Sequence, residues 1–497
     1  MLIGNRDHFA FDLEPVSPSW DRRYAPEAAA WAGLAIWIAG QNLCAHIREG
    51  EDELRERLFV PLGPLADWFA SSYLALTLEE RAPLLPTSQA LHDLVHDWAG
   101  PPPREIDEDA WLDAREAFWS RHFLSAGAEG ARLPNLAILR EDDRLFAWWR
   151  PPCFLGEPRV TMFHRVGEAS LRWTEFSEVL ARFVSFVAVT FRDAGLQHVY
   201  SWAQSGSLLD IAASDEDKIG LFCARSPEEL ASLLGVAPST LRTVLGFGES
   251  VADPATSPAC QIIRDLPPWP SLGVGSEILD LVSMIRAAPS SKSSTWRRLR
   301  DVSLDAARAG RTPEHEGQLA AQTLREELGL DGQPIQDMDA LIRRFDLLER
   351  PTELATHGER MIVASVADRR PMLSIFSTPR TKINWGRRFE QARATGHVML
   401  DPEREGVVGA ASSSYAQELR RRRSGAFAAE LLLPDSALER LSANRRDGAA
   451  EREVFARILA DYGVGARTAA HQLNNHGWLS GRHVLEELIE SFAARES

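Results

Sequence analysis

The sequence predicts an α+β protein with an N-terminal mixed α/β domain, a helical middle segment, and a mostly helical C-terminal domain that contains a small sheet. Three observations support this prediction. Candidate strands and helices alternate over roughly the first 200 residues, the following hundred residues are helical and acidic, and 12 of the 15 tryptophans lie before residue 270. We therefore expect three domains, at residues 1–200, 201–305 and 306–497.

Length and composition fit this division. At 497 residues the chain is long enough for two to four domains of about 100–200 residues each. Hydrophobic residues make up 44% and charged residues 25%, which is a globular composition. The 71 acidic and 55 basic residues give a net charge of −16, which opposes non-specific binding to nucleic acid. A nucleic-acid role would therefore need a local basic patch.

Alternating apolar residues predict strands in the N-terminal part, at 8–15, 33–40, 144–149 and 159–173. Apolar residues spaced three and four apart predict helices at 64–80 and 174–191. A helical stretch at 226–248 and a turn-rich stretch at 253–275 precede a serine-rich linker at 287–296. Beyond the linker we expect helices at 315–330 and 337–347, a strand pair within 359–377, and further helices.

The cysteines and the apolar stretches indicate a cytoplasmic protein. The four cysteines lie far apart and form no C-x-x-C pair: Cys44, Cys153, Cys223 and Cys260. The N-terminal residues do not show the basic segment followed by an apolar core that is typical of a secretory signal. The longest apolar stretches, 28–40 and 179–191, are shorter than the roughly 18 residues that span a bilayer. We expect no membrane association.

Five landmarks follow one another in the C-terminal third: "AQTLREELGLDGQPIQDMDALIRRFDL", "PMLSIFS", "RRFEQARATGHVMLD", "SGAFAAELLLP" and "YGVGARTAAHQLNNHGWLS". From about residue 312 to 480 the chain resembles the ImmA/IrrE group of metallopeptidase-like domains. The resemblance implies a zincin-like fold. It also implies a link to gene regulation, because active members typically cleave a repressor and switch on mobile-element, stress or phage-related genes.

The resemblance also implies that the zinc site is degenerate. Active members carry H-E-x-x-H on one helix, where two histidines four residues apart bind zinc and the glutamate activates water. Here Arg393 stands at the first ligand position, Ala394 at the catalytic glutamate and His397 at the second ligand. The third ligand lies six residues before Phe427, which gives Arg421. We therefore expect no metal, no cofactor and no peptidase activity.

Two weaker metal candidates stay open. His397 and Asp401 are four residues apart and form a two-point ligand set. His92 and His96 in "LHDLVHDWAG" also have the spacing of a zinc motif, with an aspartate in place of the glutamate. Since zinc sites usually have at least three protein ligands, surface or packing roles are the default for all four residues.

Seven arginines form a possible anion or partner site around the degenerate motif. Guanidinium groups bind phosphate and carboxylate through paired hydrogen bonds, so such a cluster could make a cationic cleft. The alternative is a solvated helix face balanced by acids such as Glu418, because four consecutive arginines point in several directions around a helix. The residues are Arg387, Arg388, Arg393, Arg420, Arg421, Arg422 and Arg423.

A DNA-binding role is a further alternative. Residues 227–246 have the outline of a helix-turn-helix with Gly235 at the turn. However, residues 215–249 contain six acids and three bases, so the positive surface that binds phosphates is missing. The chain also has no phosphate loop, dinucleotide fingerprint or G-x-S-x-G elbow.

The sequence thus predicts a non-catalytic pseudo-peptidase with a regulatory, stress-linked, phage-defence or toxin–antitoxin role, acting by binding a protein partner. The tryptophan-rich N-terminal half is the expected place for a specific partner or sensing function. The alternatives are an active zinc peptidase that cleaves a repressor-type protein through an unrecognised ligand set, and a DNA-binding regulator that uses residues 227–246.

Overall fold

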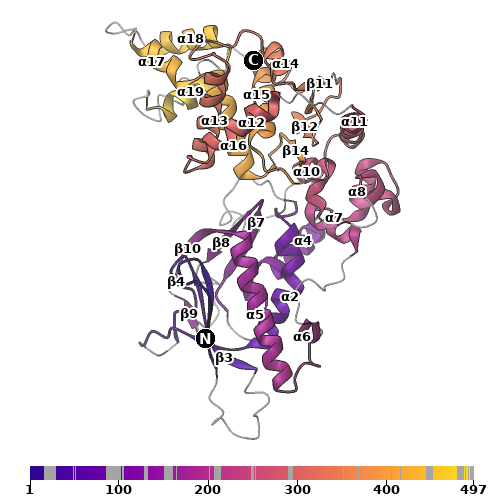
Figure 1. Cartoon of the computed structure of the whole chain (residues 1–497), viewed down its shortest axis with the longest axis vertical. Helices are drawn as coiled ribbons and strands as arrows, with labels where there is room; N and C mark the ends of the chain where they lie inside the picture. The colour runs from indigo at the N-terminus through magenta and orange to yellow at the C-terminus, as the bar shows by residue number, and fades with distance from the viewer. Residues whose placement is uncertain are drawn as a thin grey trace. The chain divides into compact units, whose positions relative to one another are not determined.

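The chain divides into two compact units, one formed by the described residues before 225 and the other by those from 225 onward (Figure 1). The three-domain division stays a prediction, and residues 225–305 pack within the second unit. No helix among the described residues is both long and apolar enough to cross a bilayer. The computed structural model describes residues 1–15, 30–48, 50, 52–84, 102, 106–127, 133–149, 161–163, 165–200, 202–205, 214–247, 251, 253–288, 295–350, 352–366, 369–404, 406–414, 416–443, 451–477, 486, 489–490 and 492.

Antiparallel sheets dominate the described part of the N-terminal unit. The largest has the order β1-β2-β3-β4, with β6 also paired to β3: β1 Leu2–Gly4, β2 Phe9–Pro15, β3 Trp31–Ile38, β4 Gln41–Asn42 and β6 Leu58–Pro61. A second has the order β10-β8-β7, with β7 Leu136–Glu141, β8 Arg144–Trp149 and β10 Gly167–Arg172. The third pairs β5 His46–Arg48 with β9 Thr161–Phe163.

The helices of this unit are α2 Leu62–Leu78, α4 Glu108–His122, α5 Trp173–Asp193, α6 Trp202–Ser205 and α7 Asp215–Cys223. The long helix α5 packs on the largest sheet through a periodic apolar face, in which buried residues recur every three or four positions from Phe176 to Phe191. Ring stacking joins the two layers, since the centroids of Phe11 and Phe183 are 4.2 Å apart.

The C-terminal unit contains one small sheet and many helices. The sheet has the order β11-β13-β12-β14, where β11 and β13 are parallel and the other pairs antiparallel: β11 Leu348–Arg350, β12 Met361–Ser365, β13 Met372–Ile375 and β14 Val408–Ala411. The helices up to the sheet are α8 Pro227–Leu234, α9 Leu241–Val244, α10 Pro258–Arg264, α11 Val274–Ala287, α12 Thr295–Ala307, α13 Pro313–Glu327 and α14 Met338–Arg344. The later helices are α15 Asn384–Leu400, α16 Glu418–Leu432, α17 Asp435–Ala443, α18 Glu451–Tyr462 and α19 Ala466–Asn475.

Local sequence explains where several of these helices begin. Thr312 caps α13 by accepting a hydrogen bond from the backbone amide of His315, and Pro313 follows at the first helical position. Ser226 and Glu229 form a reciprocal capping box at the start of α8, and Gly235 ends that helix in the left-handed conformation. Capping residues and proline thus define these helix ends before any tertiary packing.

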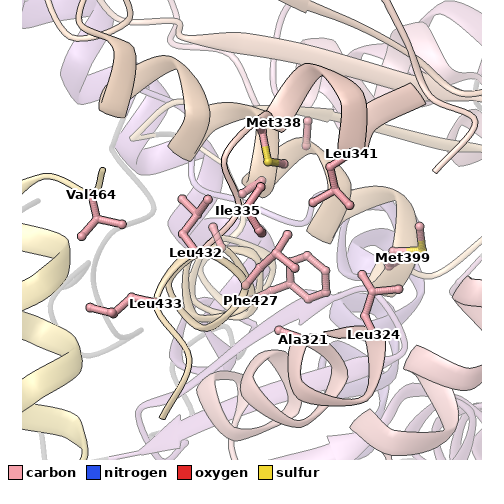
Figure 2. Close-up of a cluster of buried hydrophobic side chains, with 14 of the residues drawn as sticks. Ala321, Leu324, Ile335, Met338, Leu341, Met399, Phe427, Leu432, Leu433 and Val464 are labelled. Carbon is pink, nitrogen blue, oxygen red and sulfur yellow. The ribbon is translucent and has the colours of Figure 1, made fainter. Parts of the chain in front are cut away.

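Helix α16 lies at the centre of the C-terminal unit and packs against both α13 and α15. Figure 2 shows its Phe427 beside Ala321 and Leu324 of α13, and all three side chains are fully buried. The helices approach closely at two glycines. A Cβ atom on Gly317 would collide with the carbonyl oxygen of Arg423, and one on Gly396 would lie 3.0 Å from the ring of Phe427. Small residues at these crossings allow the close packing.

Residues 225–305 belong to the second unit because their side chains form hydrogen bonds with strands of the C-terminal sheet. Gln261 of α10 accepts a hydrogen bond from the amide of Gly409 in β14 at 2.8 Å. Glu277 of α11 accepts one from Ser374 of β13 at 2.6 Å. The α10 contact matters for the fold because β14 is an edge strand, and the amide of Gly409 is paired by Gln261 rather than by a neighbouring strand.

The predicted α+β fold class is confirmed. The strand pair within 359–377 is the antiparallel β12–β13 hairpin. The segment 159–173 differs from the expected single strand, since its described residues form β9 and β10, which belong to different sheets. The sequence does not predict strands β1, β4, β5, β6, β7, β11 and β14. All of them except β7 have only two to four residues, which is too short for a clear alternation of apolar and polar positions.

Candidate functional site

The degenerate motif lies on α15, which is almost wholly buried from Arg388 to its end. Arg393 and His397 are four residues apart and therefore lie on the same side of the helix. Ala394 is fully buried and belongs to the apolar core of the unit. A methyl group at this position cannot accept a proton, so it cannot perform the role of the catalytic glutamate.

Arg393 is buried against an acid of its own helix. Its Nη1 donates a hydrogen bond to Oγ of Ser412 at 2.5 Å and lies 3.4 Å from Oε2 of Glu390. Its Nε and Nη2 have no hydrogen-bond partner among the described residues, although only 5% of the residue is exposed. Burial lowers the pKa of Arg393, and the neighbouring guanidinium groups of Arg360 and Arg380 lower it further, whereas Glu390 raises it.

Glu390 is the acid that holds this arrangement together. Its side chain is fully buried, accepts a hydrogen bond from Ser412 at 2.9 Å and lies 3.4 Å from Nη1 of Arg360. Burial by itself would raise the pKa of Glu390, but Arg393 and the nearby Arg360 and Arg380 hold it below its ordinary value. A buried carboxylate is therefore kept ionised by cations rather than by a metal.

A pocket of about 480 Å³ opens above Arg393 between α15, α16 and α19. Gly425, Ala426 and Ala429 of α16 line it, and their small side chains leave the space open. Serine, threonine, glutamine and asparagine side chains add hydrogen-bonding groups. Arginine is the most frequent residue in the wall, and we call the six that line it the pocket arginines: Arg360, Arg380, Arg393, Arg421, Arg422 and Arg467.

The pocket arginines carry more positive charge than their neighbours neutralise. Glu390 contacts Arg360 and Arg393, Glu418 binds Arg421 with an Nε–Oε2 distance of 2.9 Å, and Glu314 binds Arg422. Six arginines against these three glutamates leave an excess of three positive charges within the described residues. Arg467 forms no ion pair with a described acid, so the α19 wall keeps its charge uncompensated.

The structure brings into this one pocket two of the three positions that the family resemblance assigns to zinc ligands. Arg393 and Arg421 come from different helices and are 28 positions apart, yet both line it. His397 does not line it. The imidazole of His397 is fully buried, and its Nδ1 lies 2.8 Å from Oδ2 of Asp401. Its Nε2 has no partner among the described residues.

His397 and Asp401 form part of a buried charge cluster rather than a two-point ligand set. Asp401 is fully buried and also lies 3.1 Å from Nη2 of Arg423 and 3.5 Å from Nε of Arg420. Although burial opposes its ionisation, Arg420, His397 and Arg423 hold the pKa of Asp401 well below its ordinary value. A carboxylate bonded to Nδ1 is also the arrangement that orients metal-binding histidines in zinc sites.

Four of the seven predicted arginines do not line the pocket: Arg387, Arg388, Arg420 and Arg423. Arg387 is exposed and binds Glu349 with an Nη2–Oε1 distance of 2.5 Å. Arg388 is buried and donates to the backbone carbonyls of Ile335, Tyr462 and Gly463 at 2.6–3.1 Å. The run at 420–423 fans out around α16 as the helical period requires: Arg420 and Arg423 bind Asp401, while Arg421 and Arg422 line the pocket.

The side chains at the ligand positions do not fit a zinc ion. Guanidinium groups have no lone pair to donate and carry a positive charge, so Arg393 and Arg421 repel a divalent cation. One imidazole remains, which is fewer than the three protein ligands of ordinary zinc sites. Within the described part of the chain, no three His, Cys, Asp or Glu side chains gather as a metal site. His92 and His96 lie outside the described residues.

Sequence patterns missed four basic residues that line the pocket. Arg360 and Arg380 precede β12 and α15 as isolated cations, and no spacing rule connects them to the motif. Arg467 and His471 of α19 are four residues apart and so share a helix face, which was a usable signal. Burial and the charge of Arg467 lower the pKa of His471, which favours the neutral imidazole.

Comparison with known proteins supports the resemblance in this region. Residues 386–474 match the model of the Peptidase_M78 family, described as the IrrE N-terminal-like domain. The match spans α15 to α19 and so contains most of the pocket. Searches of curated proteins and of solved structures found no match. The family likeness therefore concerns the C-terminal region alone.

Proposed function

We propose that the IrrE N-terminal-like domain of this chain is a non-catalytic pseudo-peptidase whose former active site binds a partner molecule without cleaving it. One observation carries the proposal: Arg393 and Arg421, which stand at two of the three ligand positions, line one pocket in which arginines replace metal-binding side chains. A regulatory role in stress response or phage defence belongs to the proposal through the family resemblance.

The chemistry of hydrolysis supports this proposal. A zinc peptidase needs a metal-bound water and a base that removes its proton. Ala394 supplies no base, and the nearest acid on the helix, Glu390, is enclosed by Arg360, Arg393 and Ser412. A carboxylate stabilised by guanidinium groups in this way is a weak base. The expected positions therefore supply neither the ligands for a metal that binds the water nor a base that removes its proton.

The two alternative functions have less support. An active peptidase would need a ligand set that does not include the three family positions. A DNA-binding regulator would need a recognition helix, but α9, the second helix of the 227–246 outline, has only four residues and so about one turn. The six acids and three bases around it also remain unfavourable for phosphate contacts.

A cytoplasmic location is part of the same proposal. The cysteines that the structure describes, Cys44, Cys223 and Cys260, are free and buried. Burial raises the pKa of the Cys44 thiol to about 12, which keeps it unreactive. Free thiols of this kind are typical of a reducing compartment.

The test is the zinc content of the purified full-length protein, measured by elemental analysis after exposure to zinc and desalting. We expect much less than one zinc ion per chain. The variants H397Q and H357Q should be indistinguishable from the parent in zinc content. His357 is the matched control because it is exposed and lies outside the pocket.

One zinc ion per chain that is lost in H397Q but retained in H357Q would overturn the proposal in favour of an active metal site. The parent measurement stands even if H397Q folds poorly, because His397 is fully buried. If H397Q does not fold, stoichiometric zinc in a protein that carries H92Q and H96Q would contradict the proposal, because that zinc could not come from the second candidate pair.

A further inference from the structure

One of the pocket arginines, Arg393, has hydrogen-bond donors that no described residue uses. Arg393 is 95% buried and lines the pocket, yet two of its three nitrogen atoms have no partner among the described residues. Buried donors are nearly always hydrogen-bonded in native proteins, and an unmet guanidinium costs more than an unmet neutral group. These two donors are therefore available to an acceptor from outside the described chain.

A second pocket arginine, Arg380, also has a donor that the described residues do not use. Arg380 lies over the rings of Phe389 and Trp385, with its Cζ 5.2 Å and 5.7 Å from their centroids. Its Nε also lacks a hydrogen-bond partner among the described residues. Stacking holds the guanidinium plane in place without using its N–H groups, so these remain free for a ligand.

The charge and size of the pocket define the ligand class. An excess of three positive charges is more than one carboxylate or one phosphate neutralises, since a phosphate monoester carries about −1.5 to −2 at pH 7. The volume of about 480 Å³ lies in the range of small-molecule pockets rather than of single-ion sites. Thr468 on α19 and Ser413 and Ser414 add hydroxyl groups for uncharged parts of the ligand.

We infer that the pocket binds a small molecule containing a diphosphate group, either free or as part of a nucleotide. Guanidinium groups match phosphate oxygens in pairs, and two adjacent phosphates are long enough to contact arginines of more than one wall. This inference rests on the proposed function, because it requires that the former active site holds an anion in place of a metal.

The test is isothermal titration of the full-length protein with inorganic pyrophosphate, ATP and citrate in the presence of EDTA at constant ionic strength. We expect pyrophosphate to bind with one site per chain and citrate, a tricarboxylate, to bind at least about tenfold more weakly, because carboxylates are spaced differently from phosphates. Tighter binding of ATP than of pyrophosphate would identify a nucleotide, and equal binding a diphosphate group alone. Both outcomes support the inference.

Three arginine variants connect the binding to the pocket. R467Q and R393Q should each weaken pyrophosphate binding about tenfold or more, because each removes charge-assisted donors. R387Q should leave binding unchanged, since Arg387 is exposed and pairs with Glu349 outside the pocket. R467Q is the decisive variant if R393Q is unstable, because Arg467 has no described ion pair whose loss would disturb the fold.

Absence of pyrophosphate binding at millimolar concentration and low salt would overturn the inference. So would citrate binding as tight as that of pyrophosphate, or an equal loss of affinity in R387Q and R467Q. These failures are distinct from failure of the proposed function, which depends on zinc content. A protein that binds neither zinc nor pyrophosphate would contradict this inference and would still agree with the proposed pseudo-peptidase function.

Discussion

Two groups of arginines in the C-terminal unit differ in what their guanidinium groups contact. The inner arginines, Arg300, Arg325 and Arg388, are buried and donate to backbone carbonyls of neighbouring segments. The pocket arginines face one another, their acids and open space. The comparison teaches that buried arginines can serve the fold alone, and that our proposal for the pocket arginines depends on unsatisfied donors that lie beside a cavity.

The largest effect is expected for an inner arginine. Arg325 donates to the carbonyls of Asp331, Gln333 and Leu431, so R325A removes three hydrogen bonds and leaves the buried carbonyl of Leu431 unpaired. We expect the free energy of unfolding to fall by about 3–5 kcal/mol, measured by chemical denaturation. The exposed Arg387 is the control, and R387A should change stability by less than about 1 kcal/mol. Similar losses in the two variants would contradict the structural role of Arg325.

The next effect is expected at Asp401, the acid shared by His397, Arg420 and Arg423. Replacement D401N removes the carboxylate that the guanidinium groups of Arg420 and Arg423 share with the imidazole of His397, and we expect a loss of about 3 kcal/mol at pH 7. Because the pKa of Asp401 is lowered in the folded state, its contribution is present above the ordinary carboxyl pKa near 3.8 and is lost as the pH falls below it.

Denaturation of D401N and the parent protein from pH 7 to pH 3 measures this dependence. The difference in unfolding free energy should shrink as the solution becomes acidic. D305N is the control, because Asp305 forms an exposed ion pair with Arg308. A difference that stays constant down to pH 3 would show that Asp401 does not act through its charge.

A smaller effect on stability is expected for two glycines at helix α16. Gly317 belongs to α13 and packs against α16, whereas Gly425 lies on the side of α16 that lines the pocket. At Gly317 an added methyl group would meet the backbone of Arg423 and Phe427, so G317A should cost about 1–3 kcal/mol. At Gly425, on the pocket side, a Cβ atom meets nothing within 4 Å. G425A should therefore stabilise the helix by roughly 0.5–1 kcal/mol. Thermal unfolding of both variants checks this, and the opposite signs are the result that matters.

The smallest effect on stability is expected for Arg467. Because it lies near Arg380 and His471 and has no described acidic partner, R467Q should change the unfolding free energy by less than about 0.5 kcal/mol. The same change removes one cause of the lowered pKa of His471, so that pKa should rise toward its ordinary value. An NMR titration of His471 measures the shift, and an unchanged pKa would show that Arg467 does not act on this site.

Local patterns predicted the elements that carry their own signals. The alternation in β2 and β3 and the three-and-four spacing of α5 and α13 come from burial of one face, so the sequence reveals them. Short β14 lacks such a signal, because its four residues are all buried and its pairing depends on β12 and α10. The position of residues 225–305 likewise depends on long-range hydrogen bonds such as Gln261 to Gly409.

The site was predictable in part. The spacing from His397 and Phe427 led to Arg393 and Arg421, and both lie in the pocket. Arg360, Arg380 and Arg467 were not found because they come from separate elements, and only the tertiary fold brings them together. The sequence could not show which arginines of the run at 420–423 line the pocket, because identical residues point in different directions around α16. Arg420 and Arg423 contact the buried Asp401, whereas Arg421 and Arg422 line the pocket.

The central claim is that arginines have replaced the zinc site at the family's ligand positions. Restoring the expected side chains in the full-length protein tests it most directly, through the triple variant R393H, A394E and R421E. Zinc titration should give no stoichiometric binding for the parent and one zinc ion per chain for the folded variant, with His397 as the third ligand. One zinc ion per chain in the parent, or none in a variant that folds, would contradict the account.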